Sequence, residues 1–221
     1  MRAQMRMPWK GEKIVTDVLT TLAALLSGYL LGSLNTAVVV GRLYGKDISR
    51  HGSGNAGLTN TLRVLGKSAA ALVLAGDVLK GIAACLVGLQ LGVQVQSGGA
   101  ADSLGLLAAG AGAVVGHNWP VWFGFRGGKG ALTGAAVLFM LDWRLALACL
   151  GAFAIIVAAT RYVSLGTICA TVLFAALSFM PVWGHTAYFT LFAIVMALVV
   201  VLRHRGNVQR LLAGTESKLA F

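Results

Sequence analysis

The sequence has few charged residues for its length. Charged side chains make up 11% of the 221 residues, whereas 57% are hydrophobic. A soluble domain of this size does not need so much apolar surface, so we exclude that class. The composition instead predicts an all-α polytopic membrane protein, whose apolar helices cross the bilayer.

Acidic residues are especially scarce. There are 7 Asp and Glu residues against 18 Lys and Arg residues, which gives a formal net charge of +11. In a membrane protein such an excess usually faces the cytoplasm and anionic lipid. Nucleic acid explains it less well, because the basic residues lie between apolar runs and form no continuous face. We therefore expect the lipid bilayer, and no nucleic acid, as a partner.

Motifs for metal, disulfide or serine-hydrolase chemistry are also missing. The three cysteines, Cys85, Cys149 and Cys169, lie in apolar runs without a C-x-x-C pair. The four histidines lack H-E-x-x-H spacing, and G-x-S-x-G does not occur. We interpret the cysteines as buried hydrophobes and expect neither a metal nor another cofactor.

Long apolar runs dominate what is present, and they predict seven transmembrane helices, some of them short. Residues 18–221 are expected to form one seven-helix domain after an N-terminal extension, residues 1–17. The first run ends without an A-x-A-like site, so we expect a retained span and no signal peptide. The runs are Val18–Gly41, Ser68–Leu91, Ser103–Val115, Ala131–Leu141, Leu145–Thr160 and two within Tyr162–Leu202, which is broken at 181–185.

Seven alternating segments place the polar connections on one face. Loop 42–67, loop 116–130, junction 160–164 and the tail after residue 202 together hold twelve of the 18 Lys and Arg residues. The positive-inside rule then puts this face in the cytoplasm of the cell (inner) membrane, with the N-terminus outside. The four cations within residues 1–13 favour the opposite orientation. A single span over Ser103–Phe125 is a less favoured alternative, because it would bury the polar residues 117–120.

The polar, glycine-rich stretch Gly116–Gly130 interrupts two apolar runs. Arg126 and Lys129 flank Gly127 and Gly128, and Gly130 follows. Glycine can adopt positive φ, so successive N–H groups can converge on an anion such as a phosphate. The stretch is not a Walker A loop, because Lys129 is followed by glycine. The alternative is an interfacial turn that carries positive-inside charges.

A second polar stretch, Ser53–Arg63, follows the first run. It is either a tight turn that enters a helix, with Asn60 or Thr59 as the cap, or a second anion site. In the second case Ser53 and Thr59 donate hydrogen bonds, and Arg63 binds a phosphate with its forked guanidinium.

Ionisable residues within or beside the runs form a third group. Asp77 and Lys80 lie three residues apart on one face of the second run, where they support the polar site from below or simply neutralise each other. His117 is interpreted as a capping or interface residue. His204 follows the last run, on the face of the polar motifs, and is either functional or a basic interface anchor.

Three blocks together resemble the bacterial membrane family of acyl-phosphate:glycerol-3-phosphate acyltransferases, over about residues 18–218. They are GSGNAGLTNTLRVLGK with the following GDVLKG, GHNWPVWFGFRGGKG, and RYVSLGTI with RHRGNVQRLLAGTESK. Two departures are mild: the family often has Lys at the position of Arg126 and Ser at that of Thr167.

The resemblance implies transfer of an acyl chain from acyl phosphate to the 1-hydroxyl of sn-glycerol 3-phosphate, which yields lysophosphatidic acid and phosphate. It implies Ser53, Arg63, Lys129 and His204 as catalytic residues in a monomer. Ser53 and the Gly127–Gly130 backbone would bind acyl phosphate, while the three basic side chains would bind glycerol phosphate. The further implied substrate-binding residues are Gly54, Asn55, Thr59, Asn60, Asp77, Lys80, His117, Gly127, Gly128, Gly130, Thr133, Ser164, Thr167 and Asn207.

Two features that the sequence lacks bear on the acyl donor and on the class of protein. No histidine is followed five positions later by Asp, so the H-x4-D pair of the acyl-CoA-using glycerolipid acyltransferases is missing. The rival class is a transporter of a small phosphorylated anion, for which broken helices and glycine-rich sites are typical. We find no internal repeat and only one polar face, which favours the enzyme.

Overall fold

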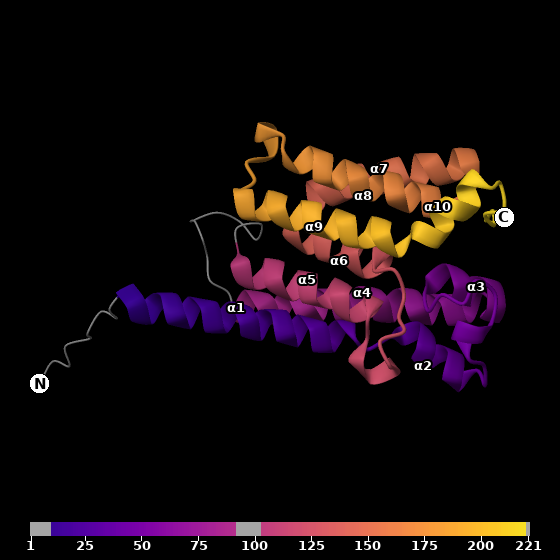
Figure 1. Ribbon diagram of the computed structural model, residues 1–221, viewed down its shortest axis with the longest axis horizontal. Coiled ribbons are helices and arrows are strands. Elements are labelled where there is room, and N and C mark those ends of the chain that lie inside the picture. The colour runs from indigo at the N-terminus through magenta and orange to yellow at the C-terminus, as the bar shows by residue number, and fades with distance from the viewer. Residues whose placement is uncertain (1–9, 92–102, 220–221) are drawn as a thin grey trace, which may run out of the picture.

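The computed structural model describes residues 10–91 and 103–219, and every regular element in them is a helix (Figure 1). The α-helices are α1 (Lys10–Gly32), α2 (Thr36–Leu43), α3 (Leu58–Leu65), α4 (Lys67–Leu91), α5 (Leu104–Asn118), α6 (Ala131–Leu141), α7 (Trp143–Thr160), α8 (Val163–Ser178), α9 (Ala187–Arg203) and α10 (Arg205–Leu212), joined by the short 3-10 helices η1 (Ile48–Arg50), η3 (Val121–Phe123) and η4 (Pro181–Trp183).

Three described helical stretches are long and apolar enough to cross a membrane. They are Gly11–Leu43, Lys67–Leu91 and Trp143–Thr160, and a fourth is added if α9 and α10, bent by 58°, count as one span. Helices α6 and α8 are apolar but shorter. The chain is therefore a helical multi-pass membrane protein, whereas the count of seven spans stays a prediction.

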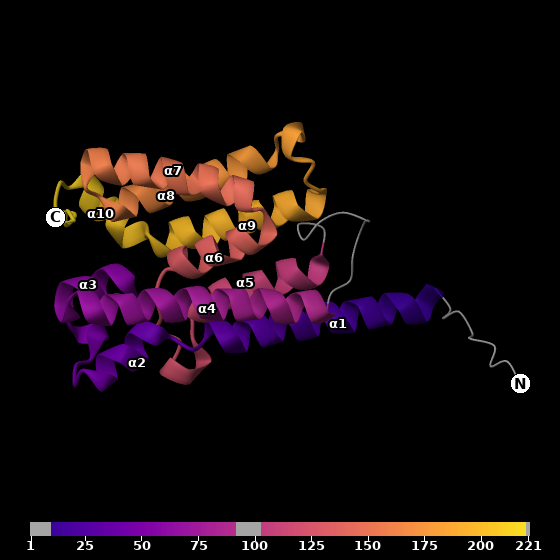
Figure 2. The ribbon, with the colours of Figure 1, turned by 180° about the vertical axis from the view of Figure 1, so that it is seen from behind.

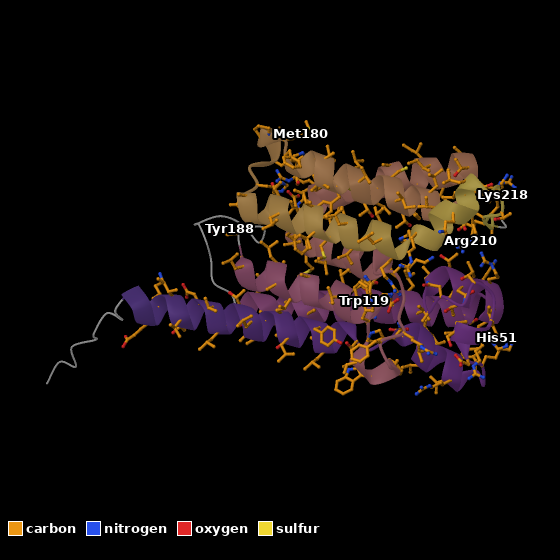
Figure 3. All side chains as sticks on the ribbon, viewed as in Figure 1. His51, Trp119, Met180, Tyr188, Arg210 and Lys218 are labelled. Carbon is orange, nitrogen blue, oxygen red and sulfur yellow. The ribbon has the colours of Figure 1, made fainter. Side chains whose placement is uncertain are left out.

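The long helices run side by side along the longest axis of the molecule (Figures 1 and 2). Helices α1, α4 and α5 form one layer, α7, α8 and α9 form another, and α6 lies between them. The α2–α3 region and the C-terminal tail lie at one end, and the α5–α6 connection lies toward it. Figure 3 shows His51, Arg210 and Lys218 at this end and Met180 and Tyr188 at the other. The connections that carry the polar motifs are therefore gathered toward one end of the bundle.

Most expected helix positions agree with the structure, and the first run is the main exception. Run Ala131–Leu141 matches α6 at both ends, and residues 181–185 separate α8 from α9. The single span expected over Val18–Gly41 lies within the helical stretch Gly11–Leu43. Helix α1 begins at Lys10, within the predicted N-terminal extension, and the chain breaks between α1 and α2. Asn35 causes the break by accepting a hydrogen bond from Val38 N (3.1 Å) as the cap of α2.

Glycines allow α1 and α5 to pack with their backbones almost in contact. A Cβ atom added at Gly28 would lie 2.1 Å from Ala109 O, and one at Gly112 would lie 2.2 Å from Leu25 O. Small residues at such positions let apolar helices approach closely. The contact brings the end of α1 against the α5–α6 connection, where Tyr29 Oη donates to the Trp119 carbonyl (3.0 Å).

The one-ended arrangement predicts the accessibility of single cysteines introduced into a background without the three native ones. We expect Lys46→Cys, Arg126→Cys and Lys218→Cys to react with a membrane-impermeant maleimide from the same side of the membrane. Val182→Cys, on the exposed η4 turn at the other end, is the matched control and should react only from the opposite side. Reaction of the first three variants from different sides would contradict the arrangement.

Candidate active site

A cavity of about 460 Å³ opens among the helices toward the end where the polar motifs gather. One part of its lining is polar and the other is apolar, so the cavity suits a ligand with a charged head and a hydrophobic tail. The polar side chains that line it are Ser53, Asn55, Thr59, Asn60, Arg63, Asp77, His117, Lys129, Ser164, Thr167, Thr171, His204, Asn207, Arg210, Glu216 and Ser217.

The start of α3 contributes the first part of the polar lining. Its N-cap residue is Gly57, and no side chain caps the helix, so the expectation of Asn60 or Thr59 as cap is wrong. Gly57, Leu58 and Thr59 all line the cavity. The first N–H groups of α3 are therefore available to an anion, which the positive end of the helix dipole favours.

Asn60 shapes the loop that carries Ser53. Its Oδ1 accepts the backbone N–H of Ser53 (2.9 Å), and its Nδ2 donates to the carbonyls of His51 (3.0 Å) and Ile48 (3.2 Å). Asn60 is buried, whereas Ser53 is exposed. The amide thus fixes the backbone at Ser53, while Gly54 (φ +70°) makes the following turn and does not line the cavity.

The start of α6 contributes the second part. Gly130 is its N-cap with φ +74°, and again no side chain caps the helix. Lys129, Gly130 and Ala131 line the cavity. Two uncapped helix N-termini and a lysine therefore meet in one cavity, an arrangement that is typical of anion binding.

Gly127 and Gly128 have a different role from the one expected. Neither has positive φ, and the N–H of Gly128 donates to the His117 carbonyl (3.0 Å), so the prediction of converging free N–H groups is wrong there. A Cβ atom at Gly127 would lie 2.1 Å from His117 O. The side chain of Arg203 donates to both glycine carbonyls, at 2.7 Å for Gly128 O and 3.3 Å for Gly127 O. These glycines do not line the cavity; they allow a tightly packed loop that carries Lys129.

A hydrogen-bonded chain from Lys129 to the C-terminal tail closes one side of the cavity. Lys129 Nζ donates to Asn207 Oδ1, and Asn207 Nδ2 donates to Glu216 Oε1 (2.6 Å). The same carboxylate accepts hydrogen bonds from Ser164 Oγ (2.8 Å) and Arg210 Nε (2.7 Å). The tail thereby connects α8 and α10. Sequence reasoning did not select Glu216, although it is the only acidic residue after residue 202.

The protonation states of three groups follow from their surroundings. Burial, together with the nearby Arg210, lowers the pKa of Lys129 to about 8. Burial raises the pKa of Glu216, but hydrogen bonds from Asn207, Ser164 and Arg210 outweigh this and hold it below the ordinary value. Burial lowers the pKa of His204 to about 4. At neutral pH the lysine is mainly charged, the carboxylate is ionised and the imidazole is neutral.

The ring of His204 is fixed by one hydrogen bond. Its Nδ1 lies 2.8 Å from the Val200 carbonyl, which assigns the proton to Nδ1 and leaves the lone pair on Nε2. The residue is 4% exposed and lines the cavity. Thr167 also lines the cavity. Its hydroxyl donates a hydrogen bond to the Val163 carbonyl (2.9 Å), so toward the cavity its oxygen can only accept one.

A buried ionic cluster lies beneath the polar lining. Lys80 Nζ lies 2.8 Å from Asp77 Oδ1 and donates to His117 Nδ1 (2.9 Å) and to the Leu34 carbonyl (3.0 Å) at the α1–α2 break. Thr133 Oγ1 lies 3.4 Å from His117 Nδ1. Asp77 and His117 reach the cavity, whereas Lys80 and Thr133 do not. The mutually neutralising pair is therefore present, and it joins α1, α4 and α5 below the site.

The apolar part of the cavity extends between α6, α7, α8 and α9 and reaches the outer surface of the bundle. Three large apolar residues of its lining are strongly exposed: Leu74 (44%), Phe139 (39%) and Leu150 (47%). These side chains border the cavity on the apolar side of the bundle, and such a surface on a membrane protein suits contact with acyl chains.

Comparison with known proteins identifies the family of the chain. The profile of the family described as "Glycerol-3-phosphate acyltransferase" matches residues 22–214. The chain is 43% identical over 203 residues to a glycerol-3-phosphate acyltransferase of Thermoanaerobacter pseudethanolicus, covering 91% of this chain and 95% of that protein. It is 44% identical over 200 residues to one of Halalkalibacterium halodurans, covering 88% and 93%.

Two solved structures are similar in fold as well as in sequence. One is the glycerol 3-phosphate form of PlsY (YgiH), described as an integral membrane glycerol 3-phosphate acyltransferase, with a TM-score of 0.81, 37% identity, and 90% and 96% of the two chains covered. The other is its lysophosphatidic acid form, with a TM-score of 0.78, 37% identity, and 90% and 95% covered. The chain therefore belongs to the glycerol-3-phosphate acyltransferase family.

Proposed function

We propose that this glycerol-3-phosphate acyltransferase takes a long acyl chain from acyl phosphate and transfers it to the 1-hydroxyl of sn-glycerol 3-phosphate. The products are lysophosphatidic acid and inorganic phosphate. The observation that carries the proposal is the single two-part cavity, in which cations and two uncapped helix N-termini lie next to an apolar part. A phosphate-bearing acyl donor and a phosphate-bearing acceptor fit such a cavity together.

The two phosphates are assigned to different sets of groups. Glycerol phosphate is bound by Arg63, Lys129 and His204, which line the cavity from α3, the start of α6 and the end of α9. Acyl phosphate is bound by Ser53 and by the backbone N–H groups at the start of α6, next to Gly130. Asn207 contributes indirectly, because its hydrogen bond orients Lys129.

The transfer needs no covalent intermediate. Acyl phosphate is an activated mixed anhydride, so the glycerol hydroxyl attacks its carbonyl carbon directly, and the bond to the phosphate oxygen breaks. A seryl ester at Ser53 would add a step without lowering a barrier. Holding both reactants together supplies proximity, worth up to about 7–11 kcal/mol in favourable cases.

The hydroxyl proton goes to a phosphate rather than to His204. Because burial lowers the pKa of His204 to about 4, the ring is a weak base. By analogy with phosphoserine, a substrate phosphate has a second pKa of about 6, which is better matched to neutral pH. His204 then binds substrate and accepts a hydrogen bond at Nε2.

Orientation and assembly complete the proposal. The end that holds loop 42–67 and the tail faces the cytoplasmic side of the inner membrane, where glycerol phosphate is dissolved. The protein acts as a monomer with seven membrane-crossing segments. Labelling from the two sides of intact cells and inverted vesicles, as described for the bundle, tests the sidedness.

Removing either phosphate-binding cation should reduce catalysis strongly. We expect Arg63→Ala and Lys129→Ala each to lower kcat/KM by about 100-fold or more, since a charged contact to phosphate is worth a few kcal/mol. Arg126→Ala is the matched control, because this cation belongs to the same loop as Lys129 but does not line the cavity. Equal losses in all three variants, measured with purified protein, would indicate a general charge effect instead.

The enzyme should use acyl phosphate as the acyl donor and show no detectable activity with acyl-CoA. We expect purified protein to form lysophosphatidic acid from palmitoyl phosphate and glycerol 3-phosphate, but not from palmitoyl-CoA and the same acceptor. The reason is that the sequence lacks the H-x4-D pair of the acyl-CoA-using glycerolipid acyltransferases. Robust turnover with palmitoyl-CoA alone would refute the assignment of the donor.

The role of His204 can be separated from that of the substrate phosphate by pH profiles. We expect His204→Gln to raise KM for glycerol 3-phosphate and to leave an inflection near pH 6 in kcat. If His204 were the base instead, its proton-accepting form would persist down to about pH 4. The wild-type rate would then fall only as pH drops through that value, and the variant would lose this limb together with most of kcat. That second pattern would overturn the phosphate-base mechanism.

A further inference from the structure

The apolar part of the cavity is a deep slot with a definite end. Phe192 of α9 lies twelve residues before His204, the C-cap of that helix, and both line the cavity, so the cavity is about 18 Å long from its polar part to its apolar end at a rise of about 1.5 Å per residue. Five residues of its lining are buried in the bundle: Leu138, Ala146, Cys149, Phe174 and Met196. An extended acyl chain therefore meets a wall before it has crossed the bundle.

That wall is aromatic. Phe174 of α8 packs edge-on against Phe192 of α9, with ring centroids 6.4 Å apart, and both rings line the slot. Phe174 also packs edge-on against Phe189 (5.9 Å), which is fully buried and does not line the slot. Edge-to-face pairs of this kind have a preferred geometry, so the rings form a defined surface.

Polar contacts hold the wall from behind. The ring of His185 stacks on Phe189 at 3.8 Å between centroids, and its Nε2 lies 3.1 Å from Asp142 Oδ2. Asp142 in turn caps α7 by accepting the N–H of Arg144 (2.9 Å). The wall is thus fixed to the starts of two helices, and a longer chain cannot easily push it aside.

We propose that the Phe174–Phe192 wall, with Ala146 beside it on α7, sets the acyl-chain length that the enzyme prefers. The inference rests on the proposed function, because it takes the slot to hold the acyl chain of the donor and product. Methylenes that fit the slot are removed from water and lipid into contact with the protein. Each methylene beyond the wall must turn out past the exposed Phe139 and Leu150, and so loses these contacts.

Making the slot shallower or deeper should shift the preference in opposite directions. Ala146→Phe fills the deep end, so we expect the ratio of kcat/KM for palmitoyl phosphate to that for lauroyl phosphate to fall about tenfold or more. Phe174→Leu opens the deep end and should raise the ratio for stearoyl over palmitoyl phosphate. Cys149→Leu is the fallback if Ala146→Phe does not fold.

Two controls are matched to these variants. Phe179→Leu makes the same change as Phe174→Leu at an exposed phenylalanine that follows α8 and does not line the slot. Ala148→Phe makes the same change as Ala146→Phe on the exposed face of α7. Both should keep the wild-type length preference, even where stability falls. An unchanged preference in Ala146→Phe and Phe174→Leu, or an equal shift in the controls, would overturn the inference.

A binding measurement separates this inference from the donor assignment. We expect palmitoyl lysophosphatidic acid to raise the Tm of the wild type more than lauroyl lysophosphatidic acid does, and Ala146→Phe to reverse the order. If no acyl phosphate of any length supports turnover by the wild type, the proposed function fails, yet this comparison still decides whether the wall selects length. Equal shifts with both lipids in both proteins would refute the wall's role.

Discussion

The site depends on the clamp that Arg203 makes on the glycine loop. Its guanidinium donates hydrogen bonds to the carbonyls of Gly127 and Gly128, while the N–H of Gly128 donates one to the His117 carbonyl. These contacts join α5, α9 and the start of α6 at one point. A buried carbonyl left without a partner costs about 1–3 kcal/mol, so the loop has little freedom to move once the clamp is made. Lys129 and Gly130 directly follow this loop in the sequence, so their backbone is held in place with it.

Carboxylates placed among the cations explain how so many positive charges gather at the end of an apolar bundle. Lys129 lies near Arg210 and Arg203, which would repel it, but Glu216 is held among them by Asn207, Ser164 and Arg210. Below the cavity Asp77 balances Lys80 in the same way. The two carboxylates thus offset part of the desolvation cost of the cations beside them, Arg210 and Lys80.

The sequence predicted most of the helix positions and most of the polar side chains in the cavity lining, because apolar runs and polar motifs are local features. Ser53, Arg63, Lys129, His204 and Asn207 all line the cavity, and their roles in binding and catalysis stay predictions. Other parts depended on contacts between distant segments. The break at Asn35, the Arg203 clamp and the carboxylate of Glu216 become visible only when α9 and the tail are placed against loops far away in the sequence. The prediction of a free N–H group at Gly128 was wrong for the same reason, because this N–H donates to the carbonyl of His117.

The most direct test of single-step transfer is the initial-rate pattern of the purified protein with palmitoyl phosphate and glycerol 3-phosphate varied together. One cavity that holds both phosphates before reaction requires a ternary complex, so the double-reciprocal lines should intersect. No acyl-Ser53 species should accumulate when the acceptor is left out. Parallel lines, the signature of a covalent acyl-enzyme that forms before the acceptor binds, would contradict the account.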